Sequence, residues 1–249
     1  MANEAQRNAA MEAIRRNIDG AGYHLYVVSG AATPRFAYTI GMSESLGFEL
    51  IMAGAVFYDL KQVVQIIKQI TEQLKSQPDR KVFEFPAYGS FALKEVDPSW
   101  STAMMLGAFD YYKKADVAAR QIVPDETHRT VDVPDMNTRW NVQSDPAWRW
   151  MYEQWPYPVP EESTVTTNLA ALRGDRITEV MRWEVDDWEI FAGAGPDVPK
   201  DELRVVPLGV LLAADPTLTP IVSLPIGGGL WRDAASDWHV WATKVSDAE

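Results

Sequence analysis

Residues 35–54, RFAYTIGMSESLGFELIMAG, constrain the fold of this chain more than any other stretch. Two apolar runs rich in strand-forming residues, at 36–40 and 49–53, flank a short segment of Ser, Glu and Gly. Apolar residues then recur at helical spacing from about residue 58 to residue 75. The stretch therefore predicts a strand, a loop, a second strand and a long amphipathic helix in succession.

The segments on either side predict further elements of both kinds. Apolar residues at helical spacing predict a first helix over residues 3–18, which ends before Gly20. Residues 23–28 are β-branched and aromatic and predict a strand that pairs with residues 35–40 across a loose loop. One or two strands are predicted at 82–96, and a short helical piece at 116–122.

Residues 124–160 are irregular, because six of the 16 prolines occur there together with four tryptophans. Trp148, Tyr152 and Trp155 fall at i, i+4 and i+7, on one side of a short helix predicted after Pro146. Two interpretations remain open. The rings either fasten two halves of the protein together or form an aromatic wall for a ligand or a partner.

A change of pattern after residue 163 predicts two domains, at 1–163 and 164–249. The second carries 7 basic and 14 acidic side chains. It predicts a β-hairpin at 177–183 and 188–192 with an acidic tip, a helix after Pro207, and a last strand at 238–242. The predicted fold class is α+β: a mostly antiparallel sheet or partly open barrel with packed helices, followed by a smaller acidic α+β domain.

Charge and composition restrict the cellular compartment and the classes of partner that we expect for this protein. The formal charge of −12 disfavours nucleic acid and anionic membranes and favours a basic partner protein or a cationic ligand. The chain has no cysteine, which excludes disulfides, thiolate nucleophiles and cysteine-bound metals. Because the first 20 residues hold no apolar signal-peptide core and no apolar run reaches membrane-spanning length, we expect a cytoplasmic protein.

The sequence contains no recognisable arrangement for catalysis or for a cofactor. His24, His128 and His239 lack the spacing of metal ligands, and only Asp125, Glu126 and His128 form a local cluster able to hold a hard metal or move a proton. The glycine run at 227–229 lacks the Lys-Ser/Thr of a phosphate loop and predicts a turn or bulge. No metal and no cofactor is therefore predicted.

A candidate pocket is predicted near the central strands. Tyr38, Thr39, Glu44 and Glu49 are polar or titratable groups beside small residues, where a ligand can approach the backbone. If Glu44 and Glu49 share a cleft, they are candidates for an acid/base pair. In the alternative interpretation Glu44 is solvated and Glu49 pairs with an arginine such as Arg35.

Four motifs of the first part carry a resemblance to a known family. They are GYHLYVV at 22–28, FAYTIGM at 36–42, ELIM at 49–52 and RQIVPD at 120–125. With them, residues 5–150 resemble the bacterial domain of unknown function 4262 family. In the tail, ITEVMRW at 177–183 and SLPIGGGLWRD at 223–233 are similar to the domain of unknown function 2185 group, some of which are immunity-like proteins. Neither resemblance implies a catalytic residue.

The leading hypothesis is thus a non-enzymatic binding or immunity-like protein. Its basic partner is expected to dock on the acidic tail, at Asp186, Asp187 and Glu189. The alternative is an enzyme or small-molecule-binding protein with a pocket at 38–49, lined by the tryptophan-rich segment 140–157. The sequence leaves the oligomeric state open.

Overall fold

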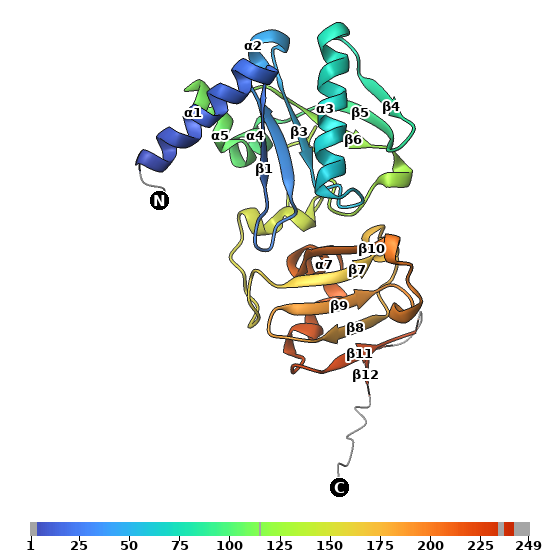
Figure 1. Cartoon of the computed structure of the whole chain (residues 1–249). Helices are drawn as coiled ribbons and strands as arrows, with labels where there is room; N and C mark the ends of the chain where they lie inside the picture. Colours follow the sequence, from blue (N-terminus) through green and yellow to red (C-terminus); the bar gives the residue numbers. More distant parts are fainter. Residues whose placement is uncertain (1–3, 115, 234–236, 242–249) are drawn as a thin grey trace. The chain divides into compact units, whose positions relative to one another are not determined.

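The computed structural model describes residues 4–114, 116–233 and 237–241, and the chain divides into two compact units (Figure 1). The first consists of Met1–Ser29, Arg35–Arg129 and Val133–Asp145. The second consists of Gly30–Pro34, Thr130–Asp132 and Pro146–Glu249. Residues 146–163 are thus grouped with the second unit, upstream of the boundary expected from composition, because the Trp150 indole donates to the Gly209 carbonyl at 2.9 Å and packs on Ala32.

The first unit is built on a six-stranded mixed sheet. Its strands, in spatial order, are β1 (His24–Val28), β2 (Phe36–Ile40), β3 (Glu49–Ala53), β6 (Ala119–Pro124), β5 (Gly89–Glu95) and β4 (Val82–Phe85). β3 and β6 run parallel, and the other neighbours are antiparallel. The sheet is therefore mostly antiparallel, as predicted. Because β1 and β4 are its edges and do not pair with each other, it is not closed into a barrel.

Helices lie on both faces of this sheet. They are α1 (Glu4–Ala21), α2 (Ser43–Leu46), α3 (Leu60–Ser76), α4 (Pro98–Met104) and α5 (Leu106–Tyr112), with the 3-10 turn η1 (Glu126–His128). Of these, α3 and α5 lie on opposite faces of the central strands. Asp59 and Gln62 form a capping box that starts α3, whose apolar stripe packs with the alternate residues Ala37, Leu50 and Met52. On the opposite face, Gly107 of α5 donates its amide to the Tyr38 hydroxyl at 3.0 Å. All residues of β2 and β3 are therefore buried.

Two local predictions for this unit are wrong in the type of element, and α1 continues through Gly20 to Ala21, past its predicted end. Residues 43–46 form the short helix α2, where a loop was predicted. The helical piece predicted at 116–122 is largely strand β6, which lies between β3 and β5 in the sheet and is mostly buried. Pairing with two strands distant in sequence overrides the weak helical pattern of this segment.

The second unit is built on another six-stranded mixed sheet. Its spatial order is β10 (Leu203–Pro207), β7 (Thr164–Asn168), β9 (Asp187–Phe191), β8 (Glu179–Arg182), β11 (Gly229–Trp231) and β12 (His239–Val240). The remaining elements are α6 (Leu169–Leu172), α7 (Leu208–Ala214), η2 (Pro146–Met151), η3 (Gly195–Asp197), η4 (Lys200–Glu202) and η5 (Pro216–Ser223). The predicted hairpin, the helix after Pro207 and the last strand are confirmed, while residue 242 lies outside the described residues.

The strands of this second sheet alternate between a buried and an outward face. Val165, Val180 and Trp188 are buried, whereas their neighbours Thr166 and Glu189 are half buried and point the other way. This alternation is typical of an antiparallel-rich sheet with a core on one side only. The outward side is called the open face below.

Candidate functional site

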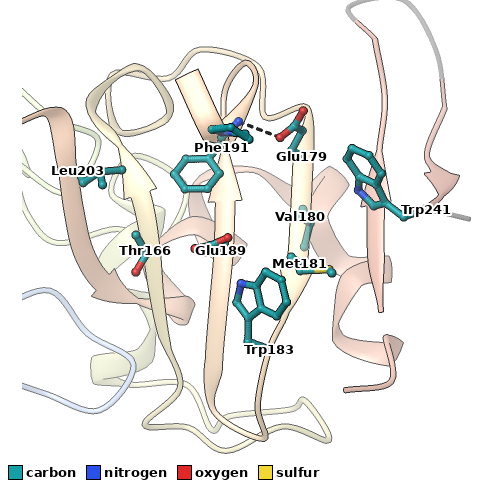
Figure 2. A pocket seen from close by; sticks show the side chains of 11 residues that line it. Thr166, Glu179, Val180, Met181, Trp183, Glu189, Phe191, Leu203 and Trp241 are labelled. Atoms are coloured by element: carbon teal, nitrogen blue, oxygen red, sulfur yellow. Dashed lines mark hydrogen bonds between the residues drawn. The ribbon is translucent and has the colours of Figure 1, made fainter. Parts of the chain in front are cut away.

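The open face carries a cavity of about 470 Å³ (Figure 2). This volume lies in the range of known ligand pockets, roughly 300–1,000 Å³. Its apolar and aromatic lining comes from Val180, Met181, Trp183, Phe191, Leu203 and Trp241. Its polar lining comes from Thr166, Glu179 and Glu189, and Gly195 and Pro196 complete the rim. The cavity is therefore largely apolar, with two carboxylates.

Strand register brings these side chains together. Glu189 of β9 lies opposite Thr166 of β7 on one side and Met181 of β8 on the other. Phe191, two residues further along β9, lies opposite Glu179. Because residues two apart on a strand share a face, the two rows are neighbours on the open face. Figure 2 shows Glu189 in the middle of the site and Trp183 beside it.

The two carboxylates differ in how they are held. Glu179 accepts a hydrogen bond from the Gly195 amide at 2.9 Å, which fixes one of its oxygens. Glu189 is half buried, and within the described part of the chain its carboxylate has no hydrogen-bond or ion-pair partner. A partly desolvated carboxylate without a donor is a site for a cation or a hydrogen-bond donor.

Two exposed indoles border the cavity. Trp183 is 46% exposed and Trp241 is 43% exposed, although tryptophan side chains are highly buried on average. The position of Trp241 depends on Gly229, because a Cβ there would come within 2.6 Å of the Trp241 ring and 2.7 Å of the Met181 sulfur. The glycine at this strand position thus leaves room for an indole at the edge of the cavity.

The predicted partner-binding residues fall partly into this cavity. Glu189 lines it, whereas Asp186 and Asp187 are exposed at the β8–β9 turn. Sequence reasoning missed Glu179, Trp183 and Trp241. The alternation in ITEVMRW, which puts Glu179 and Trp183 on one face of the strand, was the available signal for two of them.

Glu49, in the first unit, is fully buried and surrounded by donors. Its carboxylate accepts from the Thr39 hydroxyl at 2.7 Å and from the Ser43 amide and hydroxyl at 2.9 and 2.8 Å. It also accepts from the Gly41 and Met42 amides and from the Tyr112 hydroxyl. All these donors are neutral, and Arg35 instead donates to the Tyr58 carbonyl. The arrangement ties the end of β2 and the start of α2 to β3.

Of the other residues of the predicted pocket, Thr39 contacts Glu49, whereas Glu44 and Tyr38 do not join it in an acid/base site. Glu44 is exposed on α2, whereas Glu49 is fully buried. Burial raises the pKa of Tyr38 to about 12, with the Gly107 amide acting in the opposite direction. Burial, and after it the neighbouring Glu49 carboxylate, raise the pKa of Tyr112. Both phenols are therefore neutral hydrogen-bonding groups at neutral pH.

The three predicted rings of the tryptophan-rich segment belong to the second unit and do not form one wall. Trp148 is buried and donates to the Asp132 carbonyl at 2.9 Å. Trp155 donates to the Val159 carbonyl at 2.7 Å and packs edge-on against Trp150. Tyr152 is 53% exposed. Each ring thus has its own environment.

The local acid/histidine cluster forms a pair of side chains. Asp125 approaches the His128 ring nitrogen Nδ1 at 2.7 Å and accepts the Ser90 amide at 2.7 Å, while Glu126 is exposed and contacts Arg129. Partial burial favours the neutral acid, but the Ser90 and His128 hydrogen bonds outweigh it and lower the pKa of Asp125. Among the described residues no three histidine or acidic side chains gather as metal ligands.

The fold and site define a two-unit α+β protein with an open sheet face in its second unit, and comparison with known proteins finds a family match for part of the chain. Residues 17–130 match the family described as "Domain of unknown function (DUF4262)". The predicted resemblance is therefore confirmed for this part of the chain, and the resemblance of the tail stays a prediction. No curated protein and no solved structure matches the chain. No described helix has the length and apolar character needed to cross a membrane.

Proposed function

We propose that this is a non-enzymatic binding protein that holds a basic segment of a partner protein on the open face of its second sheet. The observation that carries the proposal is the cavity itself, which combines exposed indoles with two carboxylates and has no basic residue among the described residues that line it. Charge complementarity of this kind guides association and selects the partner. Residues 164–249 as a whole carry 14 acidic and 7 basic side chains, which also favours a positively charged partner.

The apolar surface around the cavity favours a protein segment as the occupant. Val205 of β10 and Trp231 of β11 are 66% and 40% exposed and lie outside the cavity lining. Val205 lies opposite Thr166 and Trp231 opposite Glu179, so exposed apolar side chains flank the cavity on both sides. A contiguous exposed apolar surface rimmed by polar groups marks an interaction site more often than a solvated surface.

The test is photo-crosslinking in the host cell followed by binding measurements with the purified partner. A photo-crosslinking amino acid is placed at Val205 on the open face, and at Val82 of β4 as a matched control with 54% exposure in the first unit. We expect a partner that crosslinks from Val205 and not from Val82. The purified partner is then titrated calorimetrically against the wild type and against the reversal D186K/D187K/E189K.

The reversal should weaken binding at least about 30-fold, because three favourable charge contacts become repulsive. The matched control reverses three exposed acids of the first unit, D19K/D79K/E84K, and should change the affinity less than about threefold. Equal crosslinking from both positions, or equal effects of the two reversals, would contradict docking on the open face.

A further inference from the structure

We propose that the cavity recognises the guanidinium of a single arginine side chain presented by the partner. This inference rests on the proposed function and specifies its central contact. The starting point is Glu189, the half-buried carboxylate that lies in the middle of the cavity in Figure 2 and has no donor in the described part of the chain. A cation that also donates hydrogen bonds satisfies both its charge and its acceptor oxygens.

The surroundings of Glu189 favour a long side chain with an apolar stem. Met181 lies directly opposite Glu189 across the β8–β9 pair, and Phe191 follows two residues along the same face. The methylene groups of a basic side chain can pack on these residues while its charged end reaches the carboxylate. Glu179, held by the Gly195 amide, supplies a second negative charge at the cavity wall.

The exposed indoles favour arginine over lysine. Trp183 lies next to Glu189 in Figure 2, and Trp241, which packs close to Gly229, lines the cavity on the far side of β8. A guanidinium is planar and weakly hydrated, so it stacks on an indole and still donates to a carboxylate in its plane. An ammonium keeps its water more tightly and cannot do both equally well. The same unit already stacks Arg182 on Trp188 at 4.9 Å and Arg232 on Trp238 at 4.0 Å.

The experiment uses peptide probes and the full chain. An acetylated and amidated heptapeptide carries one central arginine among serine and leucine residues. Its matched probes replace the arginine by lysine or by citrulline, which has nearly the same shape without the charge. Binding is followed by NMR through the indole N–H signals of Trp183 and Trp241, assigned with the W183F and W241F variants.

We expect the arginine peptide to shift both indole signals. The lysine peptide should bind about fivefold more weakly, and the citrulline peptide at least about tenfold more weakly, because the charge contact is lost. Glu189→Gln should weaken the arginine peptide about tenfold and leave the citrulline peptide unchanged. Glu184→Gln, an exposed carboxylate on the β8–β9 turn outside the cavity lining, is the matched control and should have no effect.

Each other outcome overturns a defined part of the proposal. Equal, Glu189-dependent binding of the arginine and lysine peptides would overturn the arginine preference and leave docking of a basic partner standing. Citrulline binding as tight as arginine binding, or no effect of Glu189→Gln, would overturn recognition of a cation. If free agmatine binds as tightly as the peptide, the guanidinium belongs to a small molecule, and recognition of a partner protein is overturned. The docking surface has its own test: if no partner crosslinks from Val205, docking on the open face is overturned, whatever the peptides do.

Discussion

The two described sheets each have six strands and one parallel pair, yet the glutamate at the centre of each has a different environment. In the first sheet helices lie on both faces of the central strands, and the buried Glu49 is surrounded by neutral donors. In the second sheet one face is open, and Glu189 at its centre has no donor among the described residues. Glu49 therefore has a structural role, whereas Glu189 is available to a ligand.

The difference follows from the free energy of desolvation. A fully buried carboxylate is tolerated only when hydrogen bonds replace its water, which Thr39, Ser43 and Tyr112 provide for Glu49. A half-buried carboxylate keeps part of its hydration and can persist without partners until a cation arrives. A fully buried acidic residue whose oxygens all accept hydrogen bonds thus stabilises the fold, whereas a half-buried one without donors can bind a ligand.

The largest expected effect is at Glu49. Replacement by alanine leaves several buried donors without an acceptor, each at a penalty of about 1–3 kcal/mol, so we expect a loss of about 3–5 kcal/mol in the stability of the first unit. Amide hydrogen exchange of β3 during urea unfolding measures this unit separately from the second. The control Glu44→Ala, on the exposed surface of α2, should change stability by less than about 0.5 kcal/mol. Similar losses of stability for the two variants would contradict the structural role of the buried Glu49 carboxylate.

The packing of α7 in the second unit should also be intolerant of an added side chain, with a smaller loss of stability than at Glu49. An added Cβ at Gly209 of α7 would come within 2.5 Å of the Ala32 carbonyl oxygen and 2.8 Å of the Trp150 indole nitrogen. Gly209→Ala should therefore destabilise the second unit by about 2–3 kcal/mol, through overpacking against backbone. Gly20→Ala, at a helical position with no neighbour within 4 Å, should be neutral or stabilising by about 0.5–1 kcal/mol. Thermal unfolding compares the two variants.

The hydrogen bond from Tyr112 to Glu49 gives a smaller effect with a defined pH dependence. Tyr112→Phe should lose about 2 kcal/mol, the size of a hydrogen bond to a charged group. Because the folded state raises the pKa of Tyr112, the unfolded chain ionises first, near pH 10, and stability falls as pH rises beyond that value. Wild-type protein should therefore lose stability above pH 10 more steeply than Tyr112→Phe, by up to about 1.4 kcal/mol per pH unit. Equal slopes in urea titrations at pH 9 to 11 would show that Tyr112 is not the group responsible.

Local pattern predicted the elements whose periodicity is strong. The strands at 36–40 and 49–53 have the expected positions because they are short apolar runs rich in strand-forming residues, and α3 because its apolar residues repeat at helical spacing. The strand β6 was wrongly predicted in part as helix, since its conformation depends on pairing with β3 and β5 rather than on its own residues. The parallel pairing of β3 with β6 has no signal in either strand alone.

The candidate site shows the same limit. Glu49 was selected as a titratable group near small residues, and nothing in the sequence shows that six hydrogen bonds from five other residues converge on it. Glu189 was selected for the acidic character of its surroundings, and it lines the cavity. Trp241 was not selected, because its position at the edge of the cavity depends on the pairing of its backbone with Gly229. Register across distant strands decides which side chains meet.

The smallest expected effect is the most informative about Glu189. Glu189→Leu replaces a half-buried carboxylate that has no described donor by an apolar side chain next to Met181 and Phe191. The folded protein loses no hydrogen bond and gains apolar burial, so the change in stability should lie between zero and a gain of about 0.5 kcal/mol. Urea unfolding measures it, with Glu184→Leu on the exposed turn as the control. A loss above about 1 kcal/mol at Glu189 would mean that its carboxylate holds the fold, as that of Glu49 does, and is not reserved for a partner.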